Sequence, residues 1–120
     1  MPPTPLFVFK ICARSDWDAA VTAGTYSGSH DDVRDGFIHF SGADQVRATA
    51  AKFFSGQPDL VLVAIDVAKL GAALNWEPSR GGQLFPHLYA ALDVAAARWV
   101  RPLALGPDGV PVIAEDIDRC

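Results

Sequence analysis

The chain has too few cysteines, and no apolar run long enough, for several classes of protein. Its two cysteines, Cys12 and Cys120, lie far apart and form no metal-binding or redox spacing. A disulfide between them stays open, but Cys12 lies in an apolar stretch and is most simply a small buried residue. No apolar run approaches the roughly 20 residues of a membrane span, and the first residues do not resemble a secretion signal. We therefore expect a soluble, cytoplasmic protein of bacterial type.

Positive charge is also scarce. Ten Lys and Arg residues face 14 Asp and Glu residues, which gives a net charge of −4 with neutral histidines. Affinity for nucleic-acid phosphates depends on a clustered positive surface, which this sequence does not have. We therefore expect no nucleic-acid partner, although a few local Lys and Arg residues would suffice for a small anionic ligand.

The composition predicts one compact unit. Half of the 120 residues are apolar, which is enough for a single hydrophobic core. The sequence contains no internal repeat, linker or low-complexity segment. We expect a single domain over residues 1–120, with its core at about residues 6–113, that is a monomer or a weak dimer.

Three apolar stretches predict strands. Residues 6–12 are rich in aromatic and β-branched residues, and residues 98–103 follow a short capped turn. The continuous apolar run 60–66 is typical of a strand buried on both faces and is predicted at the sheet centre. After a turn at 106–109, residues 110–113 are predicted to pair back as a hairpin arm.

Two segments have the pattern of amphipathic helices. Residues 15–24 begin with the good N-cap Ser15 and end at a glycine, and residues 42–54 follow a second N-cap, Ser41. Their predicted apolar faces comprise Trp17, Ala20 and Val21 in the first helix, and Ala43, Val46, Ala50, Phe53 and Phe54 in the second.

The order of these elements predicts an α+β fold. Residues 25–35 and 75–82 are polar or glycine-rich and are expected to be loops. Strands and helices alternate in the first half of the chain, and strands dominate the second half. We expect a curved or split sheet of about six strands with the two main helices on one side.

Two predicted strands each contain one histidine. In residues 36–41, side chains alternate so that Phe37, His39 and Ser41 share a face. In residues 83–89, one face comprises Gln83, Phe85, His87 and Tyr89. The repeated pattern favours one shared pocket, although each histidine taken singly is as readily a hydrogen-bonded core residue.

Other charged residues are candidates for ligand binding. Lys10 lies in the middle of an apolar strand, so it either reaches a sheet edge or meets an anion. Glu77 and Arg80 lie in the loop before the second histidine, and they are either functional or a solvated ion pair. His30 lies beside two aspartates but has no second histidine at ligand spacing, so no metal site is predicted.

The chain resembles the small bacterial family known as domain of unknown function 952. The resemblance depends on the order of Phe9-Lys10-Ile11, Gly36-Phe37-Ile38-His39-Phe40-Ser41, Trp76-Glu77-Pro78 and Leu84-Phe85-Pro86-His87-Leu88-Tyr89. It implies an ADP-ribosyltransferase-like fold, in which a split sheet holds NAD and three strands each present one key residue. These positions correspond here to Lys10, His39 and the strand from Gln83 to Tyr89, where many transferases of this fold have a glutamate.

The resemblance implies NAD, or another ADP-ribose-type nucleotide, as the small-molecule ligand. In such a site His39 would orient ribose hydroxyls, and Tyr89 or Phe85 would stack against a base. Lys10 or Arg80 would neutralise a phosphate, and Glu77 would supply the missing carboxylate if its loop folded over the cleft. Transferase or hydrolase activity towards NAD is the first expectation.

Two alternatives come from other functional classes. The first is a two-histidine phosphoesterase, because His39-Phe40-Ser41 and His87-Leu88-Tyr89 loosely match paired histidine-x-hydroxyl motifs for acid and base catalysis. The second is a ligand-binding module without catalysis, since a fold does not determine a function.

Overall fold

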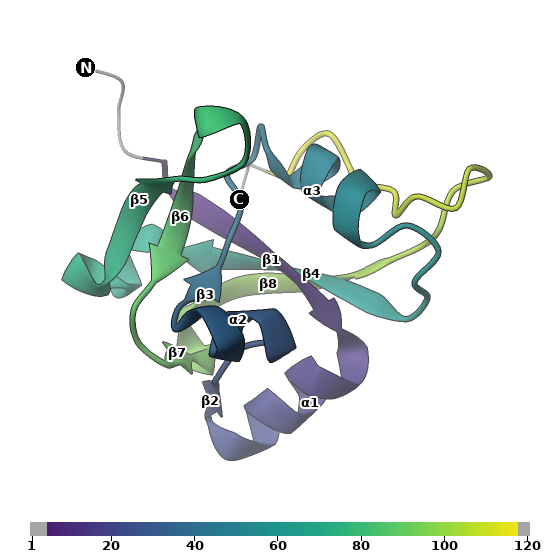
Figure 1. Ribbon diagram of the computed structural model, residues 1–120. Coiled ribbons are helices and arrows are strands. Elements are labelled where there is room, and N and C mark those ends of the chain that lie inside the picture. The colour runs from purple at the N-terminus through teal and green to yellow at the C-terminus, as the bar shows by residue number, and fades with distance from the viewer. Residues whose placement is uncertain (1–4, 118–120) are drawn as a thin grey trace.

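The computed structural model describes residues 5–117, apart from the Arg80 side chain, and shows a small α+β domain (Figure 1). The α+β prediction is therefore confirmed, but within these residues there are eight strands in three sheets, where about six in one split sheet were predicted. The strands are β1 (Phe7–Ala13), β2 (Thr25–Tyr26), β3 (Ile38–His39), β4 (Leu60–Asp66), β5 (Leu74–Pro78), β6 (Leu84–Leu88), β7 (Leu92–Asp93) and β8 (Ala97–Leu103). The helices are α1 (Arg14–Ala23), α2 (His30–Asp35) and α3 (Val46–Phe53), with short 3-10 turns η1 (Val67–Lys69), η2 (Gly71–Ala73), η3 (Arg80–Gly82) and η4 (Val94–Ala96).

An antiparallel sheet in the order β1-β4-β8 forms the centre of the molecule (Figure 1). All residues of β4 from Leu60 to Ile65 are buried, as predicted for a central strand. The sheet needs cover on both faces because β1 and the central strand β4 have apolar side chains on both sides.

The two faces of this sheet pack into two separate cores. Val8 and Cys12 of β1 point to the side that α1 covers with Trp17 and Ala20. Phe7, Phe9 and Ile11 point to the side that α3 covers with Val46 and Ala50. The prediction that both main helices lie on one side was therefore wrong, because the alternating side chains of β1 and β4 require a helix on each face.

A second sheet, in the order β3-β6-β5, contains both histidines. In this antiparallel sheet, His87 of the central strand β6 pairs with His39 of β3 on one side and with Asn75 of β5 on the other. The prediction of a loop over residues 75–82 was therefore wrong for its first half, because residues 74–78 pair with β6 as a strand. The smallest sheet is the two-residue pairing of β2 with β7.

A single β-bridge joins the first two sheets. The Phe9 amide donates to the Ser41 carbonyl at 2.8 Å, and the Ser41 amide donates to the Phe9 carbonyl at 2.9 Å. Ser41 was predicted as an N-cap, but α3 begins at Val46 and its N-cap residue is Gln45. The backbone of Ser41 is used for strand pairing, so the helix cannot begin there.

The predicted polar loop 25–35 contains a strand and a helix. Helix α2 has a capping box, in which the Ser29 side chain accepts from the Asp32 amide and the Asp32 carboxylate accepts from the Ser29 amide. The first helix was predicted correctly, including Gly24, which adopts a left-handed conformation with φ 91° at its C-terminal end. Its N-cap is Ala13, however, and Ser15 has no capping role.

The buried stripes of the helices are narrower than predicted. Val21 and Phe53 are 55% and 49% exposed, because each helix contacts its sheet along one short line. The predicted arm 110–113 is reduced to one bridge between Leu105 and Pro111. Pro111 has no amide hydrogen to extend the pairing.

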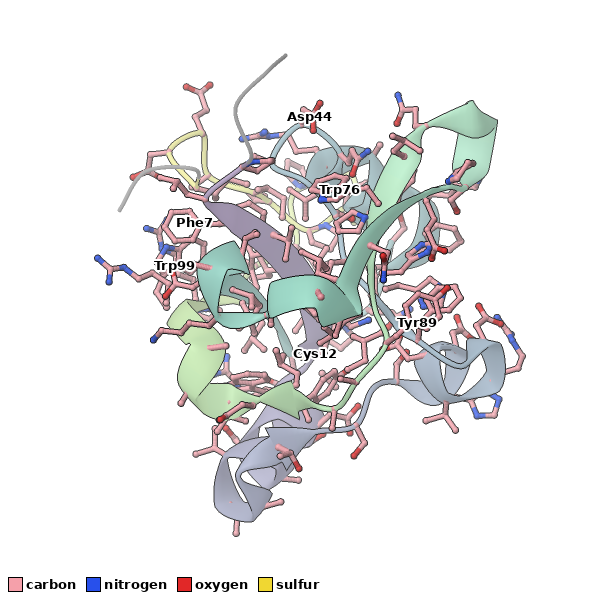
Figure 2. The ribbon with its side chains drawn as sticks, turned by 90° about the vertical axis from the view of Figure 1, so that its left-hand side faces the viewer. Phe7, Cys12, Asp44, Trp76, Tyr89 and Trp99 are labelled. Carbon is pink, nitrogen blue, oxygen red and sulfur yellow. The ribbon has the colours of Figure 1, made fainter. Side chains whose placement is uncertain are left out.

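The structure bears on the predictions made for the cysteines and for membrane-spanning segments. Cys12, labelled in Figure 2, is a buried thiol, and burial raises its pKa to about 11. It is therefore protonated at neutral pH and is a poor nucleophile. Cys120, and with it the open question of a disulfide, lies outside the described residues. Over residues 5–117, no helix is long and apolar enough to span a membrane.

Candidate functional site

The β3–β6 pairing brings the two histidines together. His39 and His87 are direct cross-strand partners, and their ring centroids are 5.5 Å apart in an edge-to-face arrangement. Direct partners in an antiparallel pair project to the same face of a sheet. The structure thus places both imidazoles at one site, as the repeated sequence pattern indicated.

His39 is held by a buried carboxylate that sequence reasoning missed. Asp32 Oδ1 lies 2.6 Å from His39 Nδ1 and also accepts the His39 backbone amide at 3.0 Å. Its other oxygen accepts from Lys10 Nζ and from the Ser29 amide, both at 2.8 Å. Burial alone would raise the pKa of Asp32, but the hydrogen bonds from His39 and Lys10 hold it well below its ordinary value.

Lys10 meets an anion, which was one of its two predicted environments. The residue is 7% exposed, and its ammonium group bonds to Asp32 and to the His39 carbonyl, the latter at 2.9 Å. The alternative of a solvated edge lysine is therefore wrong. A buried ammonium requires such a partner, because burial of an unpaired charge is costly.

The second nitrogen of His39 faces another carboxylate. His39 Nε2 lies 3.0 Å from Asp35 Oδ2 at the end of α2. Asp35 is also paired with Arg34, whose Nε lies 3.0 Å from Asp35 Oδ1, and the Arg34 guanidinium lowers the pKa of Asp35. His39 is therefore flanked by a buried carboxylate on one side and an exposed one on the other.

His87 has a carboxylate partner of its own. Glu77 Oε1 lies 2.8 Å from His87 Nδ1 and accepts from the Tyr89 hydroxyl at 2.6 Å. These bonds from Tyr89 and His87 lower the pKa of Glu77, and the same contact raises the pKa of Tyr89. The Phe37 ring stacks on His87 with centroids 4.1 Å apart, and its centroid lies 5.2 Å from that of Tyr89.

A cavity of about 260 Å³ opens beside both histidines. Its polar wall includes Lys10, Asp32, Asp35, His39 and His87, and its apolar wall comprises Phe9, Ile11, Phe40, Phe53, Phe54 and Phe85. It lies where β1 meets the chain after β3, so side chains of both large sheets line it. The cavity can hold a small molecule with one polar and one aromatic end.

The predicted site residues fall into three groups. Lys10, His39, Ser41, Phe85 and His87 line the cavity. Glu77 and Tyr89 lie outside the lining, where Glu77 is hydrogen-bonded to both His87 and Tyr89. Glu77 therefore supports the His87 imidazole from strand β5 and does not close over a cleft.

The last two predicted residues lie apart from the cavity or cannot be placed. Gln83 is exposed and outside β6. The Arg80 side chain is outside the described residues. Ser41 lines the cavity, but its hydroxyl is bonded to Thr49 Oγ1 at 2.8 Å.

The residues that sequence reasoning missed come from the segment interpreted as a loop. Asp32, Arg34 and Asp35 all belong to α2, whereas Phe37, which follows it, was already placed on the face of His39 by the strand pattern. The capping-box spacing of Ser29 and Asp32 is the signal that would have predicted this helix. In the described part of the chain, no group of three or more His, Cys, Asp or Glu side chains is arranged to hold a metal ion.

Comparisons with known proteins give a family but no activity. A family model described as "Protein of unknown function (DUF952)" matches residues 11–100. The X-ray structure of protein CC0527 from Caulobacter crescentus is 48% identical, with a TM-score of 0.86 over 88% of this chain and 93% of that one. A solution NMR structure of CC0527 gives 48% identity and a TM-score of 0.80 over 88% of this chain and 91% of that one. No curated protein matches the chain.

Proposed function

The chain belongs to the DUF952 family of proteins of unknown function, and from its site we propose that it binds an NAD-type or ADP-ribose-type nucleotide and acts on the N-ribosyl bond. The observation that supports this most is the pair of carboxylate-bonded imidazoles beside one cavity. A carboxylate on Nδ1 fixes the orientation of an imidazole and points Nε2 away from that carboxylate, and in His39 this second nitrogen contacts the exposed Asp35. Two imidazoles so held are suited to general acid and base catalysis, which contributes about 10²- to 10⁴-fold to a rate.

In this proposed reaction the two histidines have different roles. Breaking the bond between ribose C1′ and a pyridinium nitrogen sends the electron pair to that nitrogen, and the ribose carbon becomes electron-poor. Water or another acceptor then forms the new bond to C1′ and loses its proton to an imidazole. His87, which Glu77 supports, is assigned as this base, and His39, which Asp32 holds, as a group that positions the nucleotide in the cavity.

The cavity fits part of such a nucleotide. Its volume of about 260 Å³ is near the lower end of ligand pockets, which begin at about 300 Å³. One nucleoside-sized group therefore enters it, with the rest of a dinucleotide outside. The aromatic wall that includes Phe54 and Phe85 suits a planar ring, and the nearby carboxylates suit positive charge that develops on the ribose.

A two-histidine phosphoesterase is the second candidate. It is favoured by the 5.5 Å separation of the rings, which lets both imidazoles reach one phosphate. The hydroxyls of its histidine-x-hydroxyl motifs are less suited to the role. Ser41 is bonded to Thr49, and Tyr89 is bonded to Glu77 away from the cavity.

An NMR titration of the imidazole signals tests the proposal. NAD, ADP-ribose and a cyclic phosphodiester are each added to the protein, with the exposed His30 as internal control. We expect the His39 and His87 signals to shift saturably with NAD and ADP-ribose while His30 does not move. A response to the phosphodiester alone would favour the second candidate, and three unmoved signals with every ligand would contradict both.

Turnover is then measured as nicotinamide release. We expect His87→Gln to lower the rate by 10²-fold or more, given the worth of a general base, and His30→Gln to leave it unchanged. Saturable binding without release in the wild-type protein would support a ligand-binding module instead.

A further inference from the structure

The Asp35 carboxylate occupies a position that an external anion could fill. Its two oxygens face Arg34 Nε at 3.0 Å and Arg34 Nη2 at 3.4 Å, and Oδ2 also lies 3.0 Å from His39 Nε2. A guanidinium edge and an imidazole nitrogen converging on one carboxylate form the geometry that recognises phosphate and carboxylate groups. Arg34, Asp35 and His39 all line the cavity.

Asp35 is held far less firmly than Asp32. The side chains of Arg34 and Asp35 are 60% and 34% exposed, and exposed ion pairs contribute little to stability. The Asp32 side chain is only 1% exposed and is fixed by Lys10, Ser29 and His39. A ligand can therefore replace Asp35 on His39, whereas Asp32 stays in place.

The proposed ligand needs a partner for its negative charge. Both cationic side chains described in the cavity lining, Lys10 and Arg34, are already paired with aspartates. Lys10 is buried against the fixed Asp32, so it cannot turn to a ligand without leaving that carboxylate unpaired. Arg34 becomes available as soon as Asp35 moves away.

We propose that Arg34 and His39 form a phosphate subsite that the chain's own Asp35 occupies in the absence of ligand. A phosphate group of the nucleotide displaces Asp35, takes over the contacts to the Arg34 guanidinium and to His39 Nε2, and thereby anchors the ligand at the rim of the cavity. This inference rests on the proposed function for the identity of the nucleotide, but the subsite itself requires only a phosphate group.

Two aspartates allow a matched test. Asp31 and Asp35 both contact Arg34, Asp31 at 3.2 Å, but only Asp35 also contacts His39. Asp31→Asn and Asp35→Asn therefore make the same change in net charge, and only the second removes the competing carboxylate from His39. Inorganic phosphate and ADP-ribose are the probes, and binding is followed through the His39 imidazole signal at one fixed pH and at physiological salt.

We expect Asp35→Asn to tighten the binding of both probes by about two- to fivefold, the worth of an exposed ion pair. Asp31→Asn should change binding by less, because salt screens a general charge effect and Asp35 still covers His39. In the double variant Arg34→Gln with Asp35→Asn, the gain should disappear. Equal gains from the two Asn variants, or a gain that survives the loss of Arg34, would overturn the proposal.

The outcomes separate this inference from the proposed function. If phosphate binds with the expected order among the variants but NAD and ADP-ribose do not bind, the subsite stands and the nucleotide assignment fails. If NAD binds and nicotinamide is released, but Asp35→Asn gives no gain, the function stands and the subsite is wrong. An urea unfolding curve for each variant checks that the exposed substitutions leave the fold intact.

Discussion

Asp32 accepts hydrogen bonds from three residues that are far apart in the sequence, Lys10, Ser29 and His39. At the scale of single residues, it therefore links β1, the start of α2 and β3. The same carboxylate balances a buried ammonium and orients an imidazole. Its removal is expected to affect stability and the site together.

The substitution Asp32→Asn is expected to lower the free energy of unfolding by about 3–5 kcal/mol, the cost of leaving one partner of a buried ion pair alone. Here the uncompensated charge is the Lys10 ammonium. Urea denaturation measures the change. Asp35→Asn, which removes an exposed carboxylate, is the control and should leave the free energy of unfolding nearly unchanged.

A double variant keeps the test informative if the Asp32→Asn chain does not fold. Lys10→Met combined with Asp32→Asn removes the buried charge as well as its partner, so it should be more stable than Asp32→Asn alone. If the double variant were as unstable as the sum of the two single variants, the ion pair would not be the source of the effect.

Acid should weaken the fold through the same carboxylate. Because the pKa of Asp32 is lower in the folded than in the unfolded chain, its stabilisation is complete above the unfolded value of about 3.9 and is lost as the pH falls through the native value. The free energy of unfolding should therefore fall below about pH 4. Urea curves from pH 6 to pH 2.5 measure this slope, which should be shallower in the Lys10→Met, Asp32→Asn variant. An unchanged slope would assign acid sensitivity to other carboxyl groups.

At the scale of elements, apolar periodicity predicted the strands that pack into the cores. It missed helix α2 and the start of α3, which depend on a few polar contacts. The strands β1, β4 and β8 follow apolar runs and were predicted close to their observed bounds, and β6 follows the alternating pattern around His87. Helix α2 has one buried residue, the charged Asp32, so its sequence has no apolar stripe to detect. The start of α3 was misplaced because Ser41 satisfies the N-cap pattern locally, whereas its backbone pairs with Phe9.

The same difference applies to the site. The two histidines were found because they alternate with large apolar residues along strands, which a sequence displays directly. Their carboxylate partners were found in one case only. Glu77 was a candidate because it stood beside Arg80 in the segment before the second histidine strand, whereas Asp32, only seven residues before His39, was one of several aspartates in a segment interpreted as a loop. The contact between Lys10 and Asp32 spans 22 residues and depends on the packing of α2 against β1, which no local pattern encodes.

Ser15 and Ser29, which lie at or near the starts of helices α1 and α2, provide a test of helix capping. Ser29→Ala is expected to destabilise the protein by about 1 kcal/mol, because the side chain caps α2 by accepting from the Asp32 amide. Ser15→Ala should have an effect close to zero, since α1 is capped at Ala13 without a side-chain bond. Thermal or urea unfolding of both variants measures the difference. A larger loss for Ser15→Ala would contradict the assigned helix start.

At the scale of the whole molecule, two cores share the strands β1 and β4. Neither core can lose its packing without exposing the back of a strand that the other core needs. The single-domain prediction over residues 1–120 therefore implies one cooperative unit, although the apolar side chains form two clusters.

Coincident unfolding would support that implication. Trp17 lies in one core and Trp99 packs against the other, so each reports on one face of the sheet. With Trp76→Phe as background, variants that retain only Trp17 or only Trp99 should give fluorescence transitions with the same urea midpoint after correction for stability. Separate midpoints within one variant, measured by fluorescence and by circular dichroism, would indicate that the two cores unfold independently.

The bridge between Phe9 and Ser41 has a consequence for how this architecture can diversify. Its two hydrogen bonds use backbone atoms only, yet both side chains line the cavity. The connection between the sheets does not use the Ser41 side chain, so substitutions at Ser41 can alter the polarity of the cavity while the backbone bonds remain, whereas Phe9 is also needed in the core. Proteins built on this scaffold can therefore acquire new ligand preferences at a position whose backbone joins the two sheets.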